Sequence, residues 1–245
     1  MSIIRRFTDT LGFLTRLAPA RVIPEEEMNR CMAYMAPVGA VLGVVVVLPF
    51  YLGLFGSTPW IQAWLMVAAN IYLTRGLHFD GLADICDGVT THAVPERFWE
   101  VVKDSHTGAF GSIGLVMMIV GQVLLFHEMA AVGAFGAILW VFVVGRGVSV
   151  WLGYTVRHLT RPGLGKLYID GATLPVALWS TAFTFLLGLI LAGPLTTACG
   201  MLVAGIVIIP VHKLATHVGG VNGDFLGCAT LLGELAAGLG FVLFL

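Results

Sequence analysis

Apolar stretches of about 20 residues recur along this chain, and they restrict its fold more than any other feature of the sequence. A stretch of that length can cross a bilayer as an α-helix, which satisfies its own backbone hydrogen bonds in lipid. Hydrophobic residues make up 58% of the chain and charged residues only 11%. A soluble domain could not bury so much apolar surface. The sequence therefore predicts an all-α, polytopic transmembrane bundle that forms a single domain over residues 1–245.

The candidate membrane spans cover residues 34–55, 60–78, 111–127, 131–153, 174–192, 195–212 and 226–245. The third span is short and the last is rich in Gly and Ala, so the sequence allows six spans or seven. We expect the second helix to continue into the acidic segment that follows it. The N-terminal segment IIRRFTDTLGFLTRLAP mixes arginine with large apolar residues. This composition indicates either an amphipathic helix on the membrane face or a basic tail that sets topology.

Basic residues are distributed very unevenly between the predicted loops. Lys and Arg occur in the N-terminal segment, in loops 79–110 and 154–173, and after the sixth span, whereas turns 56–59 and 192–197 have none. The positive-inside rule then places the N-terminus and the long loops in the cytoplasm. We expect the protein in the inner membrane of a bacterial cell. A net charge of −1 indicates no nucleic-acid partner. The sequence leaves the oligomeric state open, including a homo-oligomer.

Three carboxylates stand close together in LHFDGLADICDG, residues 77–88. On an α-helix Asp80, Asp84 and Asp87 fall within an arc of roughly 60°. They repel one another there, and we expect them near the C-terminal end of the helix, where its dipole disfavours anions. A hard divalent cation such as Mg²⁺ would offset both costs. The alternative is a solvated acidic helix end, which the apolar residues between the carboxylates disfavour.

Further candidate residues lie in two later loops. Pro95 is well placed to open a short helix, and Asp104 near the end of that helix is a fourth candidate metal ligand. The amides of Gly108 and Gly111, in GAFG, could bind a phosphate, although small residues also allow close packing in a membrane bundle. Asp224, in GGVNGDFLG, lies in a Gly-rich loop before the last span, which is a position suited to anionic substrate groups.

Charged side chains inside predicted spans suggest function. Arg146, between two glycines, must face a polar interior, where it could bind phosphate or form a structural ion pair with Glu234. Lys103, beside the acids, is a candidate for phosphate or for a leaving group. His106 could accept a proton, as could one of the carboxylates.

These motifs resemble the cobalamin synthase family, the adenosylcobinamide-GDP ribazoletransferases. The matching segments occur in family order over nearly the whole chain, and the DGLAD…DG and KDS…GxxG pair is specific. They are FLTRLAP (13–19), YMAPVGAVLG (34–43), LHFDGLADICDG (77–88), KDSHTGAFG (103–111), GR (145–146) and NGDFLG (222–227).

The resemblance implies transfer of the adenosylcobinamide phosphoryl group from adenosylcobinamide-GDP to the 5′-hydroxyl of α-ribazole or its 5′-phosphate, with release of GMP. Metal ions and cations suit such a transfer. We expect Asp80, Asp84, Asp87 and Asp104 to hold one or two Mg²⁺ ions. Two alternatives stay open: a CDP-alcohol phosphotransferase that acts on lipid, and a divalent-cation transporter.

Overall fold

The structure is a computed structural model that describes residues 2–91 and 94–244, and this part of the chain is almost entirely helical. The α-helices are α1 (Ile3–Leu14), α2 (Glu25–Cys31), α3 (Met35–Tyr51), α4 (Pro59–Leu73), α5 (Leu77–Val89), α6 (Pro95–Val102), α7 (Ala109–Ala131), α8 (Phe135–Val156), α9 (Leu164–Ile169), α10 (Leu174–Leu191), α11 (Pro194–His217) and α12 (Gly223–Val242). Short 3-10 helices follow α2 and α8.

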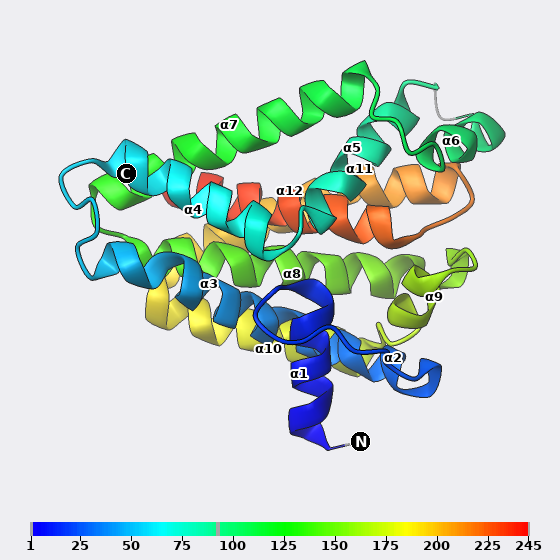
Figure 1. Cartoon of the computed structure of the whole chain (residues 1–245), viewed down its shortest axis with the longest axis horizontal. Helices are drawn as coiled ribbons and strands as arrows, with labels where there is room; N and C mark the ends of the chain where they lie inside the picture. Colours follow the sequence, from blue (N-terminus) through cyan, green and yellow to red (C-terminus); the bar gives the residue numbers. More distant parts are fainter. Residues whose placement is uncertain (1, 92–93, 245) are drawn as a thin grey trace.

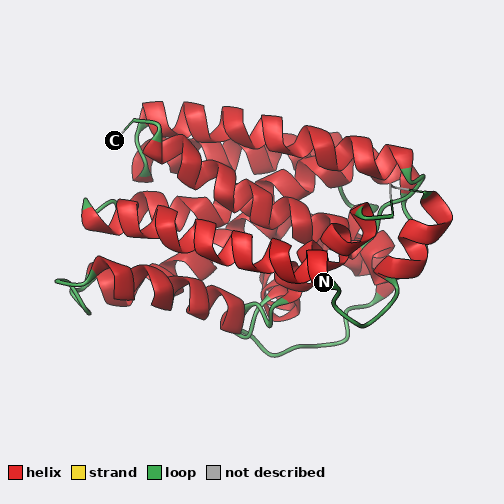
Figure 2. Ribbon diagram, turned by 90° about the horizontal axis from the view of Figure 1, so that it is seen from above, coloured by secondary structure: helices red, strands yellow, loops and turns green. Residues whose placement is uncertain are grey.

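The long helices lie side by side along the long axis of the molecule (Figure 1, and from above in Figure 2). Helices α8 and α12 are buried at the centre, because small residues let their neighbours approach closely. A Cβ on Gly39 of α3 would lie 2.4 Å from the carbonyl oxygen of Phe142, and one on Gly233 would lie 2.9 Å from Gly145. Glycines thus bring α3, α8 and α12 into backbone contact.

Within the part of the chain that the structure describes, six helices are long and apolar enough to cross a membrane, which makes the chain a multi-pass membrane protein. The spans are Glu25–Tyr51, Ala109–Ala131, Phe135–Leu159, Leu174–Leu191, Pro194–His217 and Gly223–Val242. The predicted all-α bundle is therefore confirmed. The predicted span at residues 60–78 is the exception, because it is divided between α4 and α5.

The expectation that the second helix continues into the acidic segment is wrong. Helix α4 ends at Leu73, and both Arg75 and Gly76 adopt the left-handed region, with φ values of 57° and 69°. Arg16, from the N-terminal segment, donates its backbone amide to the Leu73 carbonyl (2.7 Å) and its Nε to the Tyr72 carbonyl (2.8 Å). These bonds satisfy carbonyls at the end of α4, so the helix stops there and α5 begins anew.

Helices α4 and α5 together carry the chain from one end of the bundle to the other (Figure 1). They have 15 and 13 residues, and each is too short to span a bilayer alone. The end of the bundle that bears α6 and α9 is called the α6/α9 end below. Figure 1 shows the tight turns after α3, α7 and α10 at the opposite end.

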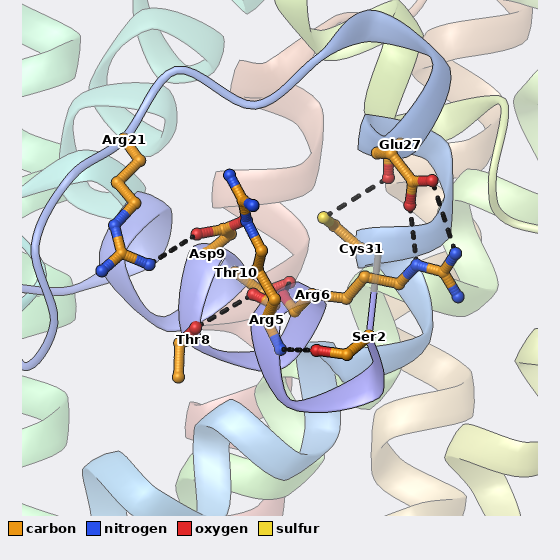
Figure 3. A network of polar contacts seen from close by, with 9 residues as sticks. All are labelled: Ser2, Arg5, Arg6, Thr8, Asp9, Thr10, Arg21, Glu27 and Cys31. Atoms are coloured by element: carbon orange, nitrogen blue, oxygen red, sulfur yellow. Dashed lines mark hydrogen bonds and ion pairs between the residues drawn. The ribbon is translucent and has the colours of Figure 1, made fainter.

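The predicted N-terminal helix is present, and α1 lies across the axis of the bundle (Figure 1). Polar contacts join it to the segment that follows (Figure 3). Arg6 donates Nε to Glu27 Oε2 at 2.7 Å, and Arg21 lies 3.5 Å from Asp9. Ile3 and Ile4 are exposed, which is the arrangement of a helix whose apolar residues enter the membrane interface.

Candidate active site

Helix α5 presents its carboxylates to the N-terminal end of α12. The contact is close because Gly81 has no side chain: a Cβ there would lie 2.8 Å from the Cα of Asp224. Asp80 lies in the first turn of α5, so the expectation that all three aspartates lie near a helix C-terminus is wrong for this residue. The break before Leu77 causes the difference, and the helix dipole favours an anion in a first turn.

Asp80, Asp84 and Asp224 form what we call the carboxylate cluster. Asp84 is half-buried, and the charges of Asp224, Asp80 and Asp87 act on its carboxylate. Asn222 caps α12 and donates Nδ2 to Asp224 Oδ2 at 2.5 Å, which fixes that side chain. Two segments far apart in sequence thus bring carboxylates together at the α6/α9 end.

Asp87 is held differently from the cluster. Its carboxylate accepts hydrogen bonds from the amides of Gly108 (2.7 Å) and Gly111 (2.8 Å) at the start of α7. These two amides, expected to bind phosphate, are therefore not free for a ligand in this structure. A Cβ on either glycine would collide with the Asp87 carboxylate where it now lies, so the two glycines make room for these hydrogen bonds. Asp87 thus fixes α7 against α5 and satisfies the N-terminus of α7.

Asp104 and His106 form a pair in the exposed loop between α6 and α7. His106 Nδ1 lies 2.7 Å from Asp104 Oδ1, and the His106 backbone amide donates to the same oxygen at 3.0 Å. The hydrogen bonds from the side chain and backbone of His106 hold the pKa of the Asp104 carboxyl below its ordinary value. With Nδ1 turned to the carboxylate, Nε2 is left as the proton acceptor of a neutral imidazole.

A cavity of about 460 Å³ lies beside Asp80. It is lined by the break between α4 and α5, by Phe13 at the end of α1, and by Thr107 and the first turns of α7. Arg75 closes one side by donating to the carbonyls of Gly12 (2.9 Å), Phe13 (3.1 Å) and Thr15 (2.7 Å). The carboxylate cluster therefore adjoins a space that the N-terminal segment helps to enclose.

Arg146 lies in the core and not at the cluster. It is 1% exposed and forms an ion pair with Glu234, which also accepts from Gln122 (2.7 Å) and Asn70 (3.3 Å). The structural ion pair that the sequence allowed is thus present, and the guanidinium is not available to a substrate phosphate. Lys103 is exposed at the end of α6 and lines a separate cavity with Arg161.

Comparison with known proteins identifies the family. The family model described as cobalamin-5-phosphate synthase matches residues 6–242. The chain belongs to this family. The adenosylcobinamide-GDP ribazoletransferase of Nitratidesulfovibrio vulgaris (strain DSM 19637 / Miyazaki F) is 43% identical over 232 residues, which are 95% of this chain and 92% of the relative. The enzyme of the same name from Klebsiella pneumoniae (strain 342) is 33% identical over 246 residues, with 95% and 97% covered. No solved structure matches the chain.

Membership of the cobalamin-5-phosphate synthase family decides against the phospholipid-synthesising and transporter alternatives. It also identifies the chain as a transferase of cobalamin synthesis. The motif segments of this family member meet in space: the N-terminal FLTRLAP segment borders the cavity beside Asp80, and NGDFLG brings Asp224 to α5.

The carboxylate cluster of this cobalamin-5-phosphate synthase family member has the oxygen ligands that Mg²⁺ prefers. The negative charges of these carboxylates repel one another, and a bound cation relieves such repulsion. As the side chains stand, no three His, Cys, Asp or Glu residues within 2–91 and 94–244 are close enough to hold one metal ion. Binding therefore requires rotation of carboxylates. Exposed Asp80 and half-buried Asp84 can rotate as they stand, whereas Asp224 must first exchange its hydrogen bond with Asn222.

Several positions that build the site in this family member were not singled out from the sequence. Gly81 permits the contact of α5 with α12, and Asn222 orients Asp224. Arg75 stands out in the sequence only as a charge in a predicted span, and in the structure it holds the end of α1. The sequence does offer one indication for Gly81, because this glycine directly follows Asp80. In the structure it lies on the side of α5 that meets α12. The Arg75 contacts have no such indication, because their partners are backbone carbonyls about 60 residues away in sequence.

Proposed function

We propose that this protein transfers the adenosylcobinamide phosphoryl group from adenosylcobinamide-GDP to a hydroxyl of α-ribazole, or of α-ribazole 5′-phosphate, and releases GMP. The names of its relatives support the donor and the acceptor. The structural observation that carries the proposal is the meeting of Asp80, Asp84 and Asp224 beside a cavity at the α6/α9 end. A diphosphate donor needs such a cation-binding site to neutralise its charge.

The attacking oxygen is better assigned to another ribose hydroxyl than to the 5′-hydroxyl expected from the sequence. The family description specifies a 5-phosphate in the product. An acceptor whose 5′-oxygen already carries phosphate has no 5′-hydroxyl to offer. One ribose hydroxyl that serves both acceptors explains both forms of the reaction with a single site.

The carboxylate cluster and the pair of Asp104 with His106 have separate roles in this proposal. Asp80, Asp84 and Asp224 would hold Mg²⁺, which supplies charge neutralisation at the diphosphate when it is bound. His106, oriented by Asp104, would take the proton of the attacking hydroxyl at Nε2. The new bond joins the ribose oxygen to the cobinamide-linked phosphorus, and the bond from that phosphorus to the GMP oxygen breaks.

A direct displacement is the simplest course for this reaction. Ser105 and His106 are candidate nucleophiles beside Asp104, and we assign the imidazole to proton transfer. A donor held in place by charge needs no covalent relay. Labelled GMP should therefore not enter adenosylcobinamide-GDP without acceptor. Rapid exchange under that condition would reveal a covalent intermediate.

We place the active site on the cytoplasmic face of the bacterial inner membrane. Basic residues at the α6/α9 end include Arg97, Lys103, Arg157 and Lys166, whereas the turns at residues 52–58, 132–134 and 192–193 at the opposite end have no Lys or Arg. The positive-inside rule supports this orientation.

The decisive experiment is turnover by the purified full-length protein in lipid nanodiscs. With adenosylcobinamide-GDP, α-ribazole and Mg²⁺ we expect equal amounts of GMP and joined corrinoid product, measured by chromatography and mass spectrometry. EDTA should stop the reaction and excess Mg²⁺ should restore it. GMP released without acceptor would instead show a hydrolase, and undiminished turnover in EDTA would remove the metal from the proposal.

A further inference from the structure

A second cavity at the α6/α9 end has the chemistry of a purine site. Its volume is about 290 Å³, and it lies between α6 and the segments around Arg161 and Val218. We infer that it binds the guanine base of the nucleotide donor, and so of the GMP product. This inference rests on the proposed function, since that function supplies the guanine nucleotide.

One wall of the cavity offers a flat cationic surface. The guanidinium carbon of Arg161 lies 4.3 Å from the centroid of the Trp99 ring. Trp99 is fixed by the hydrogen bond that its Nε1 donates to the Val218 carbonyl (3.0 Å). The backbone of Arg161 is fixed by the hydrogen bond that its N–H donates to the Val221 carbonyl (3.0 Å). A guanidinium held over an aromatic ring is a surface on which purine bases stack.

A second wall provides acceptors for the edge of the base. Glu96 and Glu100 are one helical turn apart on α6, both line the cavity, and the side chain of Glu100 is exposed. Glu100 forms an ion pair with Arg97, with Oε2 and Nη1 3.2 Å apart, whereas Glu96 has no ion pair among the described residues. Guanine presents two adjacent N–H donors, N1 and N2, which a carboxylate accepts together. Adenine presents an acceptor at N1, which a carboxylate repels.

The cavity is also in the right place for the rest of the nucleotide. Trp99 lies 6.0 Å, centroid to centroid, from Phe225, the neighbour of Asp224 in the carboxylate cluster. Lys103, on the same cavity, adds a cation for phosphate. A base stacked on Arg161 can therefore direct its phosphates past Lys103 towards the cluster.

Nucleotide binding to the full-length protein in nanodiscs, measured by calorimetry, tests the inference. The probes are GMP and IMP, which differ only in the N2 amino group. We expect GMP to bind about tenfold more tightly, because IMP leaves one charge-assisted hydrogen bond to a carboxylate unmade. The double variant Glu96→Ala/Glu100→Ala should bring this ratio close to one. The matched control, Glu25→Ala/Glu26→Ala, removes two exposed glutamates from α2 and should keep it.

Arg161→Lys separates stacking from edge recognition. It retains the charge but loses the planar group, so affinity for GMP and IMP should fall by the same factor. Equal affinity for the two nucleotides in the wild type would overturn the inference, as would an unchanged ratio in the double variant. Ribazole transfer with an unchanged ratio would leave the function standing without this site. A GMP preference lost in the double variant would support the site even if transfer were absent.

Discussion

Asp84 is the residue on which the catalytic proposal depends most directly. It lies half-buried between Asp80 and Asp224, and asparagine would keep its size while removing the charge. We expect Asp84→Asn to accumulate normally in membranes and to lose at least ~10² in turnover, because a metal contact worth several kcal/mol is gone. The control is Asp170→Asn, which removes the carboxylate paired with Lys166 on α9 and should leave turnover near the wild-type value. Wild-type turnover in Asp84→Asn would refute the metal site.

His106 offers a test of proton transfer, because its side chain is 90% exposed. His106→Ala should lower turnover by ~10² or more, the usual contribution of a general base. Added imidazole should restore part of the activity, since a small base can enter the exposed position. His158→Ala, at another exposed histidine of the α6/α9 end, should neither lose activity nor respond to imidazole. A loss in His106→Ala that imidazole does not relieve would point to a different role.

For single residues, the sequence indicates which carboxylates share a helix face but not which contacts each one makes. The helical spacing of Asp80 and Asp84 is enough to indicate a shared face. The capping role of Asp87 cannot be foreseen, because its partners are backbone amides and leave no mark on side-chain patterns. Arg146 is likewise ambiguous, since a buried arginine between glycines is equally expected beside an anionic ligand or beside Glu234.

Among the helices, the contact of α8 with α12 contains the buried ion pair of Arg146 with Glu234. Arg146 and Glu234 are buried, and Glu234→Ala would leave the guanidinium without its counter-charge. We expect this variant to lose about 3–5 kcal/mol of stability, seen as a lower unfolding temperature in detergent. The double variant Arg146→Met/Glu234→Met should recover most of the loss and keep turnover. A folded but inactive double variant would return Arg146 to the list of substrate-binding residues.

The helices themselves are largely predictable, because the length of apolar runs is the dominant signal in a membrane protein. The break between α4 and α5 is not, although Gly76 lies at it. Glycines are frequent in this chain and most of them lie within helices, so a glycine alone does not predict a helix end. The bonds from Arg16 that end α4 come from a segment 56 residues away, beyond any local pattern.

For the molecule as a whole, the orientation in the membrane decides which compartment supplies the substrates. Thr90→Cys, at the α6/α9 end, and Ser57→Cys, in the turn after α3, are exposed positions at opposite ends. In a background without the four native cysteines, an impermeant thiol reagent should label Ser57→Cys in intact cells. Thr90→Cys should react only after the inner membrane is opened. The reverse pattern would invert the topology.

The divided crossing of α4 and α5 has a consequence for how the protein is made. While it is being synthesised, a 15-residue α4 is too short to remain in the bilayer unaided, and the carboxylates of α5 make that helix costly to partition into lipid. In the folded protein α5 packs against α7 and α12, and both of these helices are translated after it. Helix α5 therefore completes its packing only after α12 is translated, so a nascent chain halted before residue 223 would lack the helix against which Asp80 and Asp84 lie.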